Sequence, residues 1–178
     1  AGSAGWCTEC AKGKFQADAR KSSCMLCERG HYQPDTTSSS CICCARGFFS
    51  NSSGLTSCFE CVGGQYQPQL GEQSCFSCAR GKYGNGTIRT AAALHCWRCE
   101  RGRYQSELGR TSCNLCPRGK FASDLESTEC LDCAASKYQS LSGQTSCVIC
   151  PVGYWLDRNE TQSCTKAPFS SRWLNVPS

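Results

Sequence analysis

The sequence predicts a small disulfide-rich repeat protein: an elongated rod of about nine 17-residue modules, made of short β-hairpins and irregular structure with almost no helix. Three observations predict this fold class. Cysteine accounts for 20 of the 178 residues, C-x-x-C pairs recur at a regular spacing, and the 39% hydrophobic content includes every cysteine. A core of other apolar side chains is therefore thin, and covalent bridges are the usual compensation in small secreted folds.

The C-x-x-C pairs define the repeat. Successive pairs begin 17 residues apart, except for one step of 21 residues that contains an insertion at 87–95, and a single Cys164 follows the last pair. We therefore divide the chain into a lead-in at 1–6 that we expect to continue upstream, an array at 7–164, and a linker or docking tail at 165–178. The first cysteines of the pairs are Cys7, Cys24, Cys41, Cys58, Cys75, Cys96, Cys113, Cys130 and Cys147.

A glycine and an aromatic residue also repeat within the module. The glycine stands two residues before the aromatic, and the eighth module has Ser136 in its place. We expect the glycine to adopt a positive φ. We expect the aromatic side chains to pack on the disulfides and on one another as a thin one-dimensional core. The only helix candidate is Thr90–Leu94. The aromatic residues are Phe15, Tyr32, Phe49, Tyr66, Tyr83, Tyr104, Phe121, Tyr138 and Trp155.

The closing singlet favours one pattern of disulfide pairing. If the second cysteine of each pair bonds the first cysteine of the next, every spacer becomes the same looped unit and Cys164 ends the series. The ladder is then Cys10–Cys24, Cys27–Cys41, Cys44–Cys58, Cys61–Cys75, Cys78–Cys96, Cys99–Cys113, Cys116–Cys130, Cys133–Cys147 and Cys150–Cys164. The alternative crosses neighbouring pairs, such as Cys7 with Cys24 and Cys10 with Cys27. It would make alternate spacers different although their sequences are alike.

Two cysteines remain outside the ladder, Cys7 and Cys43. We expect Cys7 to bond a cysteine upstream of this sequence. For Cys43 we favour a bridge to another chain, because an odd cysteine in a secreted protein suggests an intermolecular link or a reactive thiol. The alternatives are a free buried thiol and a bond between Cys7 and Cys43, which extended modules would hold too far apart.

The motif C-x-x-C-x-x-G-x-Y with a following G-x-x-S-C resembles the ephrin-receptor-like cysteine-rich repeats, which are related to the tumour-necrosis-factor-receptor cysteine-rich modules. The resemblance extends from Cys7 to Cys164. The proline that is typical after the second cysteine is present only at Pro117 and Pro151. The resemblance implies an extracellular or cell-surface location, disulfide pairing and a rod-like shape, and it implies no catalytic residues.

Metal binding and catalysis are less favoured. Paired C-x-x-C motifs also bind zinc, but nine pairs and a singlet do not divide into four-ligand sites, and the spacers do not alternate. The two histidines, His31 and His95, have no specific partner in the sequence. We therefore predict no enzyme activity, no cofactor and no metal. No stretch of roughly 18 apolar residues is present, so this segment contains no predicted membrane span.

Charge and glycosylation signals are consistent with an extracellular surface. Of the 19 basic residues, 11 flank the repeat glycine, and in extended backbone they would form a basic stripe opposite the aromatics. The stripe is either a solvated face or a contact for acidic polysaccharide or for carboxylates on another chain; nucleic acid is not an expected partner. Sequons predict N-glycosylation at Asn51, Asn85 and Asn159, and the run at 36–40 is either O-glycosylated or a flexible turn.

We predict that the chain is an extracellular structural protein, a rigid glycosylated rod in a surface fibre, matrix or flagellar-hair type assembly. Its partners would be other copies or other chains of that assembly. The alternative is a cell-surface receptor or adhesion ectodomain that binds a protein ligand, and the insertion at 87–95 would then hold the ligand site. In the tail, Phe169, Trp173 and Leu174 are candidate anchors on a partner.

Overall fold

A computed structural model describes residues 9–85, 96–156 and 161–166, and all structural statements concern these residues. They form nine two-stranded antiparallel hairpins, each strand has two residues, and the described part contains no helix. In chain order the strands are β1 (Lys14–Phe15), β2 (Met25–Leu26), β3 (His31–Tyr32), β4 (Ile42–Cys43), β5 (Phe48–Phe49), β6 (Phe59–Glu60), β7 (Gln65–Tyr66), β8 (Phe76–Ser77), β9 (Lys82–Tyr83), β10 (Trp97–Arg98), β11 (Arg103–Tyr104), β12 (Asn114–Leu115), β13 (Lys120–Phe121), β14 (Leu131–Asp132), β15 (Lys137–Tyr138), β16 (Val148–Ile149), β17 (Tyr154–Trp155) and β18 (Thr165–Lys166).

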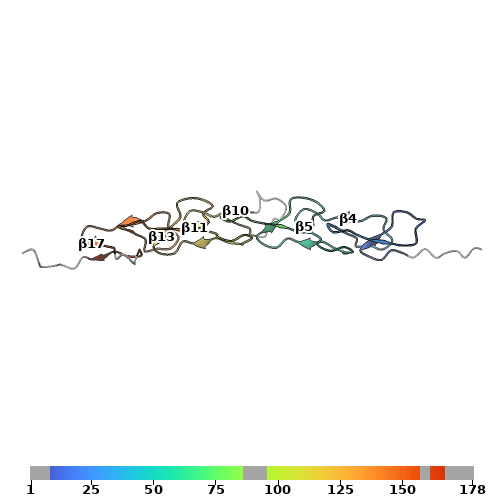
Figure 1. Ribbon diagram of the computed structural model, residues 1–178, viewed down its shortest axis with the longest axis horizontal. Helices are drawn as coiled ribbons and strands as arrows, with labels where there is room; N and C mark the ends of the chain where they lie inside the picture. The colour runs from blue at the N-terminus through green and yellow to red at the C-terminus, as the bar shows by residue number, and fades with distance from the viewer. Residues whose placement is uncertain (1–8, 86–95, 157–160, 167–178) are drawn as a thin grey trace, which may run out of the picture. The chain divides into compact units, whose positions relative to one another are not determined.

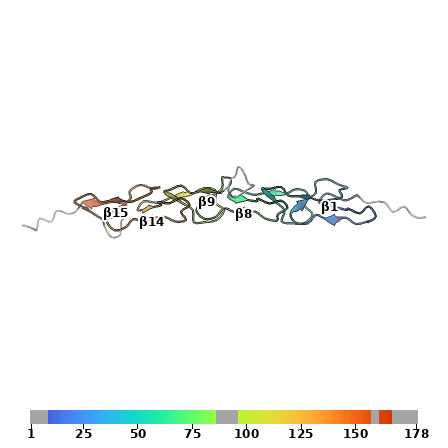
Figure 2. The ribbon, with the colours of Figure 1, turned by 90° about the horizontal axis from the view of Figure 1, so that it is seen from above.

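The chain divides into two compact units, residues 1–97 with 107–112 and residues 98–106 with 113–178. Within each unit the hairpins follow one another in chain order (Figure 1, Figure 2). The last hairpin takes Thr165 and Lys166 as β18, so the array extends two residues into the segment that the sequence assigned to the tail. The insertion at 87–95, with its helix candidate at 90–94, lies outside the described residues, as does most of the tail.

Each spacer between cysteine pairs is closed by a disulfide, and the nine bridges are those of the ladder. Eight have a sequence separation of 14, and the bridge across the insertion has a separation of 18. The crossed arrangement is therefore wrong for this structure. Each second strand starts directly after the first cysteine of a pair, which brings the bridge and the strand pair together at one end of the hairpin.

The turn before each first strand explains the repeat glycine. The turn begins directly after the second cysteine of a pair, and the amide of its fourth residue donates to the carbonyl of its first, as from Lys14 to Ala11 at 3.1 Å. The glycine is the third residue, where φ is +77° for Gly13 and +82° for Gly30. A β-turn with positive φ at this position favours glycine. The predicted positive φ is confirmed, and Ser136 adopts it as well, at 67°.

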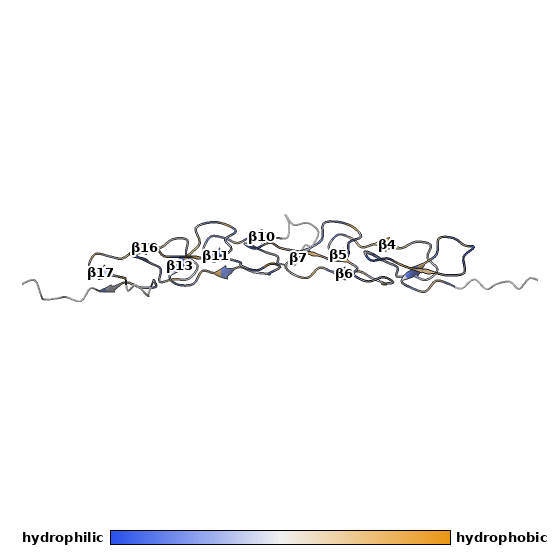
Figure 3. Ribbon diagram, in the orientation of Figure 1, coloured by the Kyte–Doolittle hydropathy of each residue, from blue (hydrophilic) through white to orange (hydrophobic). Residues whose placement is uncertain are grey.

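The buried centre of the modules is not aromatic. In most modules the second cysteine of the pair, the turn glycine and the residue after the aromatic are buried, whereas the aromatic residues themselves are half-buried or exposed. The predicted aromatic core is therefore wrong. Phe49 packs across its own hairpin on Phe59, with ring centroids 5.7 Å apart, and Tyr66 packs on Phe76 in the same way. Hydrophobic and hydrophilic residues are accordingly interspersed along the strands (Figure 3).

Candidate functional site

The candidate site is the contact between successive modules, because it is the feature that recurs along the array. Three backbone hydrogen bonds join neighbours. The turn glycine donates to the carbonyl of the residue that follows the aromatic in the next module, as from Gly30 to Ser50 at 2.9 Å. A second glycine, here called the late glycine, recurs near the end of some modules, at Gly54, Gly71, Gly109 and Gly143. The residue after the aromatic donates to the carbonyl of the residue that follows the late-glycine position of the next module, as from Gln33 to Leu55 at 3.0 Å. The late glycine donates back to a second cysteine, as from Gly54 to Cys27 at 2.8 Å.

In four of the described modules, a closer contact reaches the module after the next. A Cβ atom on Gly30 would overlap the carbonyl oxygen of Gly71 and lie 2.6 Å from its carbonyl carbon. Gly13 meets Gly54, Gly64 meets Gly109, and Gly102 meets Gly143 in the same way. At Gly153, in the last hairpin, nothing lies within 4 Å. The turn glycine is therefore required twice, by its positive φ and by the carbonyl of a module two places further along.

The late-glycine position also has positive φ, and two modules place other residues there. Gly54, Gly71, Gly109 and Gly143 have φ of 69° to 77°, and Thr37 and Glu126 occupy the equivalent positions at 58° and 62°. Positive φ costs an L-residue roughly 1–2 kcal/mol. For β-branched Thr37 it is especially unfavourable.

Replacing Thr37 with glycine is therefore expected to stabilise the array by about 0.5–1 kcal/mol, since glycine removes the strain but adds freedom to the unfolded chain. The Thr37 amide retains its bond to the Cys10 carbonyl, 2.9 Å away. The thermal unfolding midpoint measures the effect. Thr36→Gly is the matched control, because Thr36 is not among the residues with positive φ, and there glycine should destabilise by about 0.5–1 kcal/mol. Equal shifts in both variants would contradict the strain at Thr37.

A buried glutamine after the aromatic clamps the loop of its own module, a role that was not predicted from the sequence. The Gln67 side chain is 1% exposed; its Nε2 donates to the Ser74 carbonyl at 2.6 Å, and its Oε1 accepts from the Gln69 amide at 3.0 Å. Gln33 and Gln139 make the same two contacts. The signal was present, because glutamine follows the aromatic at Gln16, Gln33, Gln67, Gln105 and Gln139.

Replacing Gln67 with alanine is expected to cost about 2–3 kcal/mol, because two buried backbone groups lose their partner. Urea unfolding under non-reducing conditions measures the loss. Gln69 is the matched control, since its side chain is exposed and only its backbone amide is in the clamp. Gln69→Ala should remain within about 0.5 kcal/mol of the parent chain. If Gln67→Ala changed the free energy of unfolding as little as Gln69→Ala, the hydrogen bonds of the Gln67 side chain would not contribute to stability.

Cys43 is an exposed free cysteine in β4, so the alternative of a buried thiol is wrong. It stands opposite His31 of β3 in the strand register, and its Sγ lies 3.2 Å from His31 Nε2. The Nδ1 atom of His31 lies 3.3 Å from the Arg29 carbonyl oxygen. In other modules the equivalent of Cys43 is a surface residue such as Leu26 or Ser77. Cys7 lies outside the described residues.

The other predicted site residues are distributed over the surface. Asn51 and Asn85 are exposed, and Asn159 lies outside the described residues. The basic residues before the glycine belong to the turn and those after it belong to the first strand. Because the glycine between them has positive φ, the extended backbone from which a shared basic face was predicted is not present. One of these residues, Lys120, pairs with Asp132 across its hairpin at 2.9 Å.

Within the described part, no three His, Cys, Asp or Glu residues cluster as metal ligands would. The same residues include no helix of the length and apolarity that a membrane crossing needs.

Comparison with known families gives one match. A family model described as tyrosine-protein kinase ephrin type A/B receptor-like matches residues 47–93, 86–133 and 119–167, which together span more than half of the chain. A search of curated proteins found no match. The matched segments contain the same turn glycines, disulfides and inter-module bonds that build both units.

Proposed function

Because the chain belongs to the ephrin type A/B receptor-like family of cysteine-rich repeats, we propose that it is a structural element of an extracellular fibre, matrix or flagellar-hair type assembly. Its modules serve to hold a fixed, covalently closed backbone arrangement outside the cell. Disulfides form and persist in oxidising compartments, so nine of them favour a secreted or surface location. We propose no catalytic activity, since the family is one of receptor-type repeats.

The observation that carries this proposal is the uniformity of the contacts between modules. The same backbone hydrogen bonds recur from Gly13 to Thr161. The buried positions are occupied mainly by cystine, glycine and glutamine, so little of the buried interior distinguishes one module from another. A ligand site needs side chains that differ from their neighbours, whereas a stiff repeat needs an interface that is the same throughout.

Fractionation of native material tests the structural role. The chain is expected in large assemblies that resist detergent and that dissociate only after reduction. Recovery of the chain as a soluble monomer from intact cell surfaces or medium would contradict the proposal. Glycopeptide mass spectrometry of the same material should find glycans on Asn51, Asn85 and Asn159, since all three belong to sequons and the side chains of Asn51 and Asn85 are exposed.

We propose that Cys43 forms a disulfide with another chain of the assembly. Its thiol is exposed and has no cysteine partner among the described residues. Replacing Cys43 with serine is therefore expected to abolish a reducible band of higher mass on non-reducing gels of native material. Ser77→Ala is the matched control, because Ser77 occupies the equivalent position in β8. Alkylation of Cys43 in unreduced native material would show that the thiol is free and would contradict the bridge.

Acidic polysaccharide is a further partner that we propose for the basic residues around the turn glycines. The formal net charge of the chain is +5, and Arg29, Arg46, Arg101 and Arg118 are exposed. Such attraction is screened by salt. Binding to heparin should therefore weaken between about 0.05 and 0.5 M sodium chloride, and retention that is independent of salt would exclude this contact.

A receptor or adhesion ectodomain is the second candidate, and exposed apolar side chains on the second strands favour it. Phe59, Phe76 and Trp97 are 50–52% exposed, and aromatic residues of this kind anchor protein ligands. Replacing the insertion at 87–95 with a glycine–serine segment separates the two functions. If this variant lost binding to a soluble protein ligand while its assembly was unchanged, the receptor function would be favoured.

A further inference from the structure

Cys43 and His31 form a close pair on neighbouring strands of the first unit. They stand opposite each other in the register of β3 and β4, and the Cys43 Sγ lies 3.2 Å from the His31 Nε2. Both residues are accessible, since Cys43 is exposed and His31 is half-buried. A thiol within hydrogen-bond reach of an imidazole is the arrangement in which histidine acts as a base toward a cysteine nucleophile.

The backbone fixes which ring nitrogen faces the thiol. The His31 Nδ1 lies 3.3 Å from the Arg29 carbonyl oxygen. A carbonyl oxygen can only accept, so Nδ1 carries a hydrogen and donates it. In the neutral ring Nε2 is then the acceptor, and the Cys43 thiol is the donor. The His31 amide donates to the Glu28 carbonyl at 3.0 Å, which anchors the start of β3. The thiol proton is therefore already shared with a base.

A second segment holds the thiol from another side. A Cβ atom built on Gly71 would lie 3.8 Å from the Cys43 Cβ and 3.9 Å from its Sγ. The Gly71 amide donates to the Cys44 carbonyl at 2.9 Å, so this backbone is fixed beside β4. The sulfur thus keeps its position relative to His31 while it remains exposed. Efficient proton transfer requires such a fixed geometry.

The histidine and the unpaired cysteine also coincide in the sequence. In the other described hairpins the residues equivalent to His31 are Lys, Phe, Gln, Arg or Tyr, and no other strand contains a cysteine. Gln65 and Ser77, for example, stand opposite each other in β7 and β8. Two departures from the repeat therefore meet at one cross-strand position, which is an observation independent of the distance between their atoms.

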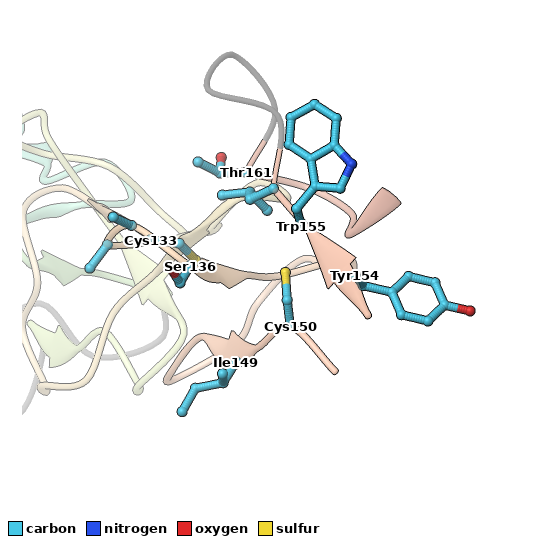
Figure 4. A pocket seen from close by; sticks show the side chains of 10 residues that line it. Cys133, Ser136, Ile149, Cys150, Tyr154, Trp155 and Thr161 are labelled. Carbon is cyan, nitrogen blue, oxygen red and sulfur yellow. The ribbon is translucent and has the colours of Figure 1, made fainter. Parts of the chain in front are cut away.

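The cavity of about 690 Å³ in the second unit offers no comparable pair. Cys133 and Cys150 line it, but both belong to bridges of the ladder. Its lining includes the hydroxyl groups of Ser136 and Thr161 (Figure 4), but no histidine, aspartate or glutamate. The lining of this cavity therefore lacks a base that could activate a nucleophile.

We propose that His31 is the general base that activates Cys43 for thiol–disulfide exchange, an inference that rests on the interchain bridge proposed above. The group attacked is a disulfide that joins a cysteine of the partner chain to a second thiol. Cys43 passes its proton to the His31 Nε2, and the thiolate attacks the sulfur of the partner cysteine. The new S–S bond forms as the old one breaks, and the leaving thiolate takes the proton from Nε2. One disulfide replaces another, so no further oxidant is consumed.

Exchange with oxidised glutathione, a small disulfide, measures the activation. All chains carry Cys7→Ser, so that a single cysteine lies outside the ladder, and intact-mass spectrometry follows the mixed disulfide. His31→Gln should slow the reaction at neutral pH by at least about tenfold. His31→Ala should be equally slow, and added imidazole should restore much of its rate by acting as the missing base. A merely structural role of His31 would not respond to imidazole.

The equivalent position in β8 supplies a matched control. In a chain with Cys7→Ser and Cys43→Ser, the substitution Ser77→Cys places an exposed thiol opposite Gln65. This thiol should react as slowly as Cys43 does in the His31→Gln chain. Adding Gln65→His should then raise its rate by at least about tenfold.

Equal exchange rates in the parent chain and in both His31 variants would overturn the inference, as would a slow His31→Ala chain that imidazole does not rescue. The interchain bridge is judged separately. A bridge in native material combined with equal exchange rates would retain the bridge and remove the role of His31. A free Cys43 in native material combined with fast exchange that depends on His31 would remove the bridge and retain the base.

Discussion

Replacing Gly30 with alanine is expected to destabilise its part of the first unit by at least about 4 kcal/mol, a loss that few single substitutions reach. The added Cβ would overlap the carbonyl oxygen of Gly71 and lie 3.4 Å from the Glu72 amide nitrogen. These are backbone atoms, held in place by the bond from the Gly71 amide to the Cys44 carbonyl at 2.9 Å. The clash therefore cannot be relieved by a rotamer change, and the strain of positive φ adds to it.

Gly153→Ala is the matched control for this prediction. Gly153 has the same positive φ, 85°, but nothing lies within 4 Å of a Cβ built there. It should cost only the strain of about 1–2 kcal/mol. Thermal unfolding, with exchange of the Gly71 amide as a local probe, measures both variants. Similar losses at the two positions would show that φ alone selects the glycine and that the contact between alternate modules is unimportant.

Reduction of the nine disulfides is expected to unfold the chain completely at neutral pH without denaturant. A closed loop of about 15 residues stabilises a fold by about 3 kcal/mol in the chain-entropy model. An ordinary domain has a free energy of unfolding of only about 5–15 kcal/mol, so the loss of several bridges exceeds what the rest of the fold provides. The second cysteines are also the buried centre of the modules, with Cys27, Cys44 and Cys61 at 0% exposure.

Hydrogen exchange after reduction and alkylation measures this effect. Protection should be lost throughout, including at amides that do not bond to a cysteine, such as Gln105, which donates to the Ser127 carbonyl at 3.0 Å. The Cys43→Ser chain with its disulfides intact is the control and should retain its protection, since this cysteine is outside the ladder. A reduced chain that refolds when zinc is added would contradict the disulfide basis of the fold.

The sequence predicted those parts of the fold that a strict period encodes. The spacing of the C-x-x-C pairs and the closing Cys164 led to the disulfide ladder, and Gly13 and its equivalents led to positive φ. The buried centre was not predicted, because aromatic residues were assigned to it on hydrophobicity alone. A module closed by a bridge such as Cys27–Cys41 already excludes water from its cystine. Its remaining interior is backbone, and a clamp of the Gln33 type saturates that backbone better than a ring does.

Contacts between alternate modules could not be predicted from the sequence, for a related reason. Gly30 and Gly71 repeat at the same interval as every other module position, so the period alone does not show which copies touch. The serine at position 136 is explained only by the structure. It replaces the turn glycine at a turn that no carbonyl from a later module of the described part contacts, and Gly153 has no such contact either. The candidate site was thus predicted in composition but not in arrangement.

Disulfide mapping of native protein tests the central claim most directly. Digestion without reduction, at a pH that suppresses thiol exchange, followed by mass spectrometry assigns each bridge. The ladder predicts that every second cysteine is linked to the next first cysteine, as in Cys44–Cys58 and Cys61–Cys75, and that Cys43 is not a partner in any of these bridges. Crossed links between neighbouring pairs, or reduced cysteines that hold zinc, would contradict it.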